Sequence, residues 1–282
     1  MHRPFALSTI GRPIQLRDPT NRAIALVSFL AVVAGTLVGA VRGEAWGAVL
    51  TGLTWAGAAF LAWALGRETD PDRPYSAFLA AAGGLSGAIL LGRPGFLFLF
   101  WFVIALRYIN RSTGVAPGIF DFVALYGLKF WLGFSAHWTI PLLTFPTVFF
   151  GDIRRFPRPV RVGLPLVLPA AAVAIGFARG WHFELPEWGW VEIGAITAIA
   201  VSIVPVVIGY RRVRSVGDRT GAPLRPHRVQ WAIVWTLAAA LILTLTGAAT
   251  IAELAPLWSA LVAASIGWGA EEVSRHLRAL VR

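Results

Sequence analysis

The sequence predicts an all-α, polytopic integral membrane protein with about ten transmembrane helices. Hydrophobic residues make up 57% of the 282 residues and charged residues only 14%, and the mean hydropathy is +0.68. A soluble domain of this length is less apolar. The apolar residues also recur in runs close to the roughly 20 residues that cross the hydrocarbon core of a bilayer. These observations favour lipid over water as the main solvent of the chain.

Ten apolar stretches are bounded by charged or Pro/Gly-rich breaks, and each predicts a helix. Several stretches have only about 15 to 17 residues, which is the lower limit for a crossing. The segments 75–109 and 118–150 are therefore also compatible with re-entrant helices, and the predicted count is eight to ten. In chain order the stretches are 23–41, 45–65, 75–92, 95–109, 118–134, 136–150, 162–178, 189–209, 229–249 and 254–272.

Arginine placement predicts the orientation of these helices. With ten crossings and a cytoplasmic amino terminus, 21 of the 24 arginines fall in cytoplasmic segments, and only Arg42, Arg93 and Arg179 lie outside. The positive-inside rule predicts this asymmetry. The first 22 residues also lack the apolar core of a secretory signal. We therefore expect a multi-pass protein of the cell membrane, with a cytoplasmic tail at 1–22, one helical bundle at 23–273 and a cytoplasmic tail at 274–282.

The net charge of +11 limits the classes of molecule that the protein is expected to bind. The basic residues lie in short loops and not on one soluble face, so they indicate contact with anionic lipid headgroups at the cytoplasmic face and not binding of nucleic acid. The chain has no cysteine, which excludes disulfides and thiolate-bound metal. A small-molecule ligand and oligomer or complex partners stay open.

Two glycine pairs, Gly35-x-x-x-Gly39 and Gly83-x-x-x-Gly87, favour close packing of helices. Small residues one turn apart let helix backbones approach in lipid. In a chain with 29 glycines such spacings also arise by chance, so both interpretations stay open.

Lys129 is the only lysine, and it lies inside an apolar run. A charged group at membrane depth is costly, which makes such residues functional candidates. Asp121 precedes it by eight residues, about 12 Å along a helix and on the same side, with Tyr126 between them. Two prolines then interrupt the run that contains His137, and irregular backbone at membrane depth is tolerated where it is buried in protein or lines a water-filled cavity. We expect a substrate site here, formed by Asp121, Tyr126, Lys129 and His137.

A purely structural interpretation of the same residues is also open. The Lys129 side chain can extend along apolar surface to the external face. Asp121 lies about one turn from the cytoplasmic end of its helix, where it can cap the helix or be solvated.

A transporter or permease for a small solute is the first functional hypothesis, with the site between the fifth and sixth helices. Pro205 predicts a further broken helix that faces it. The ten-helix plan and the length are similar to those of the drug/metabolite transporter superfamily, in topology alone. The sequence favours a function other than catalysis, without cofactors. A non-catalytic subunit of a larger membrane complex is another hypothesis.

A membrane enzyme is the remaining hypothesis, and it depends on Glu68, Asp70 and Asp72. Acidic side chains at a cytoplasmic helix end can hold Mg²⁺ for a pyrophosphate substrate. The loop resembles the first aspartate-rich motif of UbiA-type membrane prenyltransferases, which also follows their second spanning helix. That resemblance implies a magnesium-dependent enzyme acting on a polyprenyl or lipid phosphate. The family's leading Asn-Asp and its second aspartate-rich loop have no counterpart in this chain.

A second resemblance concerns the carboxyl end. Glu271-Glu272-Val273-Ser274-Arg275 is similar to the Glu-Glu-x-x-x-Arg motif of intramembrane CAAX-type proteases. It is one residue shorter than that motif, and no later segment supplies the histidine that those proteases need.

Overall fold

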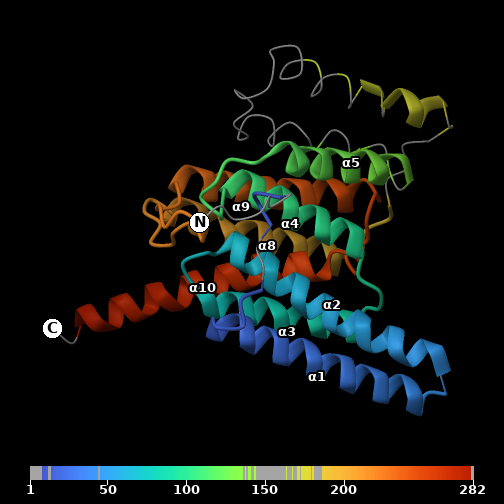
Figure 1. The fold of residues 1–282 in the computed structure, drawn as a ribbon, viewed down its shortest axis with the longest axis horizontal. Helices are drawn as coiled ribbons and strands as arrows, with labels where there is room; N and C mark the ends of the chain where they lie inside the picture. The colour runs from blue at the N-terminus through green and yellow to red at the C-terminus, as the bar shows by residue number, and fades with distance from the viewer. Residues whose placement is uncertain are drawn as a thin grey trace, which may run out of the picture. The chain divides into compact units, whose positions relative to one another are not determined.

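The described part of the chain is helical, as expected. The computed structural model describes residues 8–11, 14–43, 45–135, 137, 139–140, 143, 163, 167, 170–171, 173–178, 180 and 186–280. Within these ranges there is no β-strand, only an isolated bridge between Val216 and Pro223. The helices are α1 (Pro19–Val41), α2 (Ala45–Thr69), α3 (Pro74–Leu90), α4 (Phe96–Asn110), α5 (Ile119–Ser135), α8 (Trp190–Gly209), α9 (Pro226–Leu245) and α10 (Ala255–Leu280), drawn in Figure 1.

Eight of the ten expected stretches coincide with these helices, which confirms the all-α class. Of the other two, 136–150 lies largely outside the described residues, and 162–178 is described in part, with residues 173–178 helical. Four helices, α1, α2, α8 and α9, are long and apolar enough to cross a membrane, and α3 and α4 are shorter apolar helices. Their outward faces carry large apolar side chains, such as Phe29 of α1 and Val201 of α8, which are 63% and 65% exposed. Apolar helices with exposed apolar faces indicate a protein embedded in lipid.

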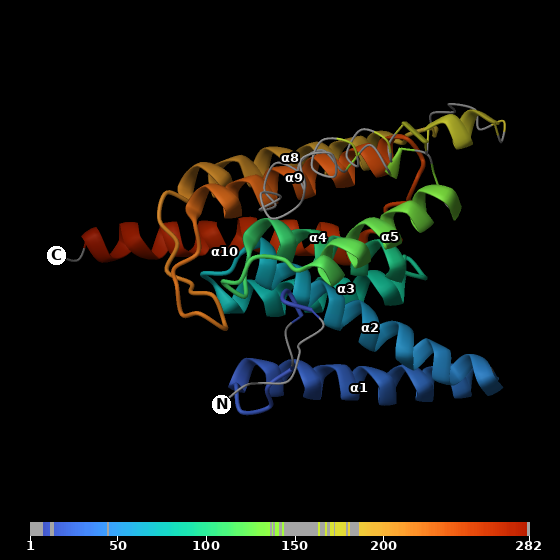
Figure 2. The same cartoon turned by 45° about the horizontal axis from the view of Figure 1, so that its top comes forward.

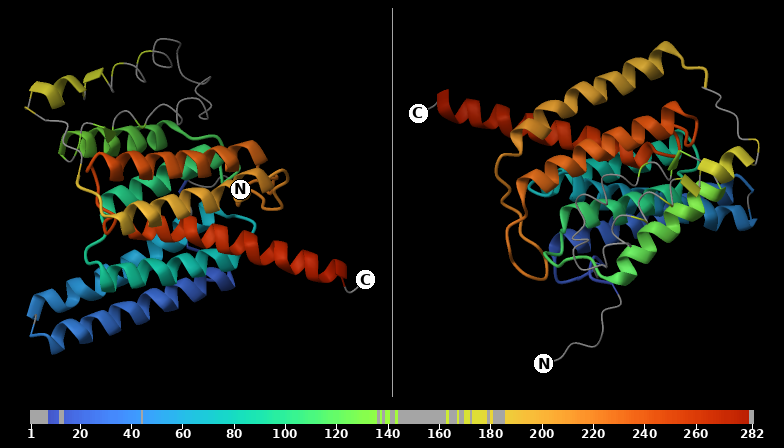
Figure 3. Two further views of the ribbon diagram at one scale, coloured as in Figure 1. Left: turned by 180° about the vertical axis from the view of Figure 1, so that it is seen from behind. Right: turned by 90° about the horizontal axis from the view of Figure 1, so that it is seen from above.

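Two helices extend beyond the apolar runs that predicted them. The first helix begins at Pro19, inside the segment expected to be a tail, because the Asp18 carboxylate caps it by accepting hydrogen bonds from the Thr20 and Asn21 backbone N–H groups at 2.7 and 3.2 Å. The last helix continues to Leu280, since its charged turns repeat at helical spacing and pair Glu272 with Arg275. The end of α10 extends past α3 and α8 (Figure 3), and its residues from 273 onward are exposed.

Pro205 does not break its helix, contrary to expectation. The helix α8 continues as one element from Trp190 to Gly209, with Pro205 inside it, and Tyr210 is its C-cap residue. The missing N–H of Pro205 removes one hydrogen bond, and apolar helices in lipid tolerate such a loss.

The chain divides into two compact units. The first comprises Met1–Pro13, Phe100–Trp188 and Arg212–Thr250, and the second comprises Ile14–Leu99, Gly189–Arg211 and Ile251–Arg282. Most of α4 and all of α5 and α9 therefore belong to the first unit, and α1, α2, α3, α8 and α10 to the second.

Glycines bring the helices of the second unit close together. The helices α1 and α2 form an antiparallel pair, with α3 following α2 (Figure 2). A Cβ at Gly35 would lie 2.7 Å from the Gly52 Cα, and one at Gly39 would lie 2.5 Å from the Ala48 Cα. The second pair packs against α10 in the same way: a Cβ at Gly87 would lie 2.8 Å from the Ala255 Cβ. The packing role of both glycine pairs is confirmed.

Aromatic side chains form the core of the first unit. Trp101 and Phe102 of α4 contact Trp235 of α9, with ring centroids 5.5 Å apart in both pairs. Such edge-on and tilted contacts suit the quadrupoles of aromatic rings. They hold α4 and α9 together.

Candidate functional site

One face of α5 carries three of the four predicted site residues. The buried positions of this helix are Asp121, Phe122, Leu125, Tyr126, Lys129, Leu132 and Gly133. Their spacing of three to four residues makes one continuous stripe. The opposite face is apolar and exposed, with Val123 and Trp131 at 59% and 58%. The helix thus turns its polar side chains inward, the reverse of a soluble amphipathic helix.

Lys129 is the most unusual residue of this face. It is 4% exposed, and its Nζ has no hydrogen-bond partner in the part of the chain that the structure describes. The Nζ lies 5.9 Å from the centroid of the Tyr126 ring, which offers a cation–π contact but no acceptor atom. The side chain therefore does not extend to an exposed surface, and its charge stays unbalanced by any described carboxylate.

Asp121 has a structural role at the start of α5. Its Oδ2 accepts hydrogen bonds from the backbone N–H groups of Gly118 at 2.8 Å and Thr9 at 3.0 Å, and the hydroxyls of Ser8 and Thr9 also donate to the carboxylate. A carboxylate with these donors caps the helix and anchors the segment at residues 8–11. Asp121 shares a face with Lys129, but its oxygens are used elsewhere.

His137 lies beyond the end of α5 and pairs with threonines. Its Nδ1 is 2.8 Å from the Thr139 Oγ1, and this hydroxyl is 3.4 Å from that of Thr246. The structure thus brings Tyr126 and Lys129 into contact, and it gives Asp121 and His137 other partners.

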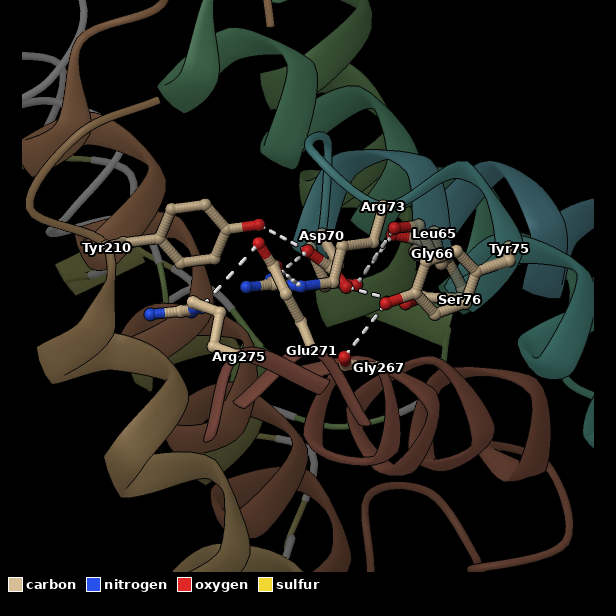
Figure 4. Close-up of polar contacts among 11 residues, drawn as sticks. Leu65, Gly66, Asp70, Arg73, Tyr75, Ser76, Tyr210, Gly267, Glu271 and Arg275 are labelled. Carbon is tan, nitrogen blue, oxygen red and sulfur yellow. Dashed lines mark hydrogen bonds and ion pairs between the residues drawn. The ribbon is translucent and has the colours of Figure 1, made fainter. Parts of the chain in front are cut away.

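The second unit holds a buried polar network that centres on Asp70 (Figure 4). Asp70 follows α2 directly and is fully buried. Its Oδ1 accepts hydrogen bonds from Arg73 Nη1 at 2.9 Å and from the Tyr210 hydroxyl, and its Oδ2 accepts one from Ser76 Oγ at 2.6 Å. The side chain joins the α2–α3 turn to the end of α8.

Arg73 extends this network to α10. Its Nε donates to Glu271 Oε2 at 2.6 Å, while Nη1 binds Asp70. One nearly buried guanidinium therefore pairs with two carboxylates from distant parts of the sequence, a geometry that suits the planar donors of arginine. Arg275, which is half exposed, lies 3.9 Å from the other oxygen of Glu271.

Gly267 permits this approach of α10. A Cβ at this position would lie 2.0 Å from Ser76 Oγ and 3.1 Å from Asp70 Oδ2. The Gly267 carbonyl also accepts a hydrogen bond from the Tyr75 hydroxyl at 3.0 Å. Only a residue without a side chain fits between the α10 backbone and the network.

Burial dominates the electrostatics of the network. It raises the pKa of Asp70, and the hydrogen bonds from Ser76, Tyr210 and Arg73 offset only part of this rise. Burial alone lowers the pKa of Arg73, but the carboxylates of Asp70 and Glu271 outweigh it, so the net pKa is raised and the guanidinium stays charged. Burial and the Asp70 carboxylate raise the pKa of Tyr210, so its hydroxyl remains a donor.

The predicted magnesium ligands do not converge in the described residues. No group of three acidic or histidine side chains there could hold a metal ion. Both oxygens of Asp70 accept hydrogen bonds, Glu68 is buried and Asp72 is half-buried. A metal would have to displace Arg73, Tyr210 or Ser76 from Asp70. Magnesium binding by Glu68, Asp70 and Asp72 stays a prediction.

Sequence reasoning identified Asp70 but missed its partners. Tyr210 is one of only four tyrosines and lies at a helix end, yet it is 140 residues from Asp70. In the sequence, Glu271 was noted only as part of a protease-like motif. Arg73 was counted as a topology signal, although it also pairs with these acids.

Comparison with known proteins assigns the chain to no family. No protein family model matches the chain, and no curated protein or solved structure is significantly similar to it.

Proposed function

We propose that this protein is a multi-pass transporter for a small solute, with ten crossings, cytoplasmic termini and a substrate site on the polar face of α5. Lys129, which is buried and has no hydrogen-bond partner among the described residues, is the observation that carries the proposal. An ionisable side chain without a partner at this depth destabilises the protein, so its retention points to a task that needs the charge.

The sealed position of Lys129 Nζ fits an occluded state of such a transporter. Solute carriers expose one central site alternately to the two sides of the membrane. Lys129 lies ten residues into a helix of 17, about 15 Å from its start, which is near mid-depth if α5 crosses the bilayer. The arginine asymmetry supports the ten crossings.

Because the chain has a single lysine, new lysines report topology directly. Arg42→Lys and Arg212→Lys keep the positive charges that set the orientation, and both positions are exposed. With sulfonated N-hydroxysuccinimide acetate, an amine reagent that does not cross membranes, we expect acylation of the Arg42→Lys variant in right-side-out vesicles and of the Arg212→Lys variant only in inside-out vesicles. Peptide mass spectrometry measures the acylation of each lysine. Acylation of both new lysines from one side would contradict the proposed topology.

The same reagent tests the transport site. If Lys129 opens alternately to the two sides, it is acylated in both right-side-out and inside-out vesicles, more slowly than the exposed lysine of the Arg42→Lys variant. A structural lysine reacts from neither side until the protein is unfolded. That second result would end the transporter proposal and favour a non-catalytic subunit.

A further inference from the structure

We infer that the solute is an oxyanion, a molecule with a carboxylate or phosphate group, and that Lys129 is its charge partner. The inference rests on the proposed function and names the class of substrate. It follows from what the surroundings of the Lys129 ammonium supply and what they lack.

No described residue neutralises Lys129. Its Nζ is buried and makes no hydrogen bond within the described residues. Asp121 is the only acid on α5, and it accepts four hydrogen bonds from Ser8, Thr9 and Gly118. A carboxylate with so many donors is already stabilised as a charge and is not available to a group two turns away.

Tyr126 covers one side of the ammonium and leaves its donors free. Its ring is three residues earlier on α5, with the centroid 5.9 Å from Nζ. The ring face attracts the positive charge but accepts no ordinary hydrogen bond. An ammonium has three N–H donors and no acceptor, so the missing group is an acceptor that also carries negative charge.

The charge of the first unit also selects for anions. Its sequence contains far more arginines than acids, among them Arg107 in α4, Arg111 just after α4 and Arg228 in α9. A net positive charge raises the local concentration of anions and lowers that of cations. A carboxylate or phosphate oxygen can form a charge-assisted hydrogen bond with Nζ, which a neutral hydroxyl would match only weakly.

Acylation of Lys129 provides the test, because only the neutral amine reacts. A bound anion keeps the ammonium protonated and slows the reaction. The Arg42→Lys variant is reconstituted in phosphatidylcholine vesicles, so that the exposed lysine of the same molecule is the control. Sodium acetate, inorganic phosphate, glycerol or tetramethylammonium chloride is added at constant ionic strength, and both lysines are followed by mass spectrometry.

We expect acetate or phosphate to slow acylation of Lys129 by about tenfold, saturably, with no change at the control lysine. Equal slowing of both lysines, protection by glycerol or tetramethylammonium, or no protection would overturn the inference. Slowing by phosphatidylglycerol in the vesicles, without added solute, would support the oxyanion and identify a lipid headgroup as its source. If Lys129 reacts under no condition, the proposed function fails and the inference with it; reaction that anions do not slow refutes the inference alone.

Discussion

Replacing Arg73 with methionine is expected to destabilise the protein by about 3 to 5 kcal/mol, the cost of leaving a buried charge without its partner. Arg73 binds Asp70 at 2.9 Å and Glu271 at 2.6 Å. Methionine fills similar space but leaves the buried Asp70 carboxylate without its cation, while Glu271 keeps only the half-exposed Arg275 at 3.9 Å. The midpoint of thermal unfolding in detergent, followed by tryptophan fluorescence, would measure the loss.

Arg275→Met is the matched control. It removes the same charge from the same cluster, but Arg275 is half exposed and pairs with Glu272 at 3.0 Å on the helix surface. Such pairs contribute about 1 kcal/mol or less. Similar losses in the two variants would show that the buried network does not hold the second unit together.

The Arg73→Met defect should also depend on pH. Burial already raises the pKa of Asp70 above 3.8, and loss of the guanidinium raises it further. When folding raises the pKa of a group, the protonated group favours the folded state. This contribution to stability is complete below the pKa of the unfolded state and is lost as the pH rises through the pKa of the folded state. The difference from wild type is therefore expected to shrink from about pH 8 to about pH 5. A defect of constant size would indicate lost packing instead of an unpaired carboxylate.

Lys129→Met is expected to have the opposite effect, raising the stability of the ligand-free protein by about 1 to 3 kcal/mol, the approximate cost of burying a polar group without a hydrogen bond. The substitution removes an ammonium without a described hydrogen-bond partner and keeps most of the side-chain volume. The lost contact with Tyr126 offsets part of the gain. Thermal unfolding in detergent would measure this shift as well.

Phe130→Met is the control for a methionine on α5. Phe130 is 41% exposed, so its replacement should change stability little. A Lys129→Met variant less stable than wild type would mean that the ammonium is well solvated or paired in the folded protein. A functional charge is typically retained at the expense of stability.

The sequence predicted the helices well because length and hydropathy are local properties. Each run from 23–41 to 118–134 became a helix, and so did the last three runs. The limits at Pro19 and Leu280 differ from the prediction because caps and charged turns extend a helix beyond its apolar part. The glycine pairs could be noticed in the sequence, but only the facing residues Ala48, Gly52 and Ala255 decide that they pack.

The polar residues were harder to assign because their partners are distant in sequence. Three neighbouring acids resembled a metal site, yet Asp70 turns inward to Arg73, Ser76 and Tyr210 while Glu68 and Asp72 take other positions. Lys129 stood out as a lone charge, but hydropathy cannot tell whether a lysine extends to the surface or stays buried. That depends on the tertiary packing around α5.

The anchoring of residues 8–11 restricts the order in which the chain can fold. Ser8 contacts Asp121, 113 residues away, and its carbonyl accepts a hydrogen bond from Arg219, 211 residues away. A ribosome releases the amino-terminal segment first, yet these contacts cannot form until most of the protein has been synthesised. The earliest residues to emerge are therefore among the last to find their partners, and completion of the first unit must follow synthesis of α5 and of the segment that contains Arg219.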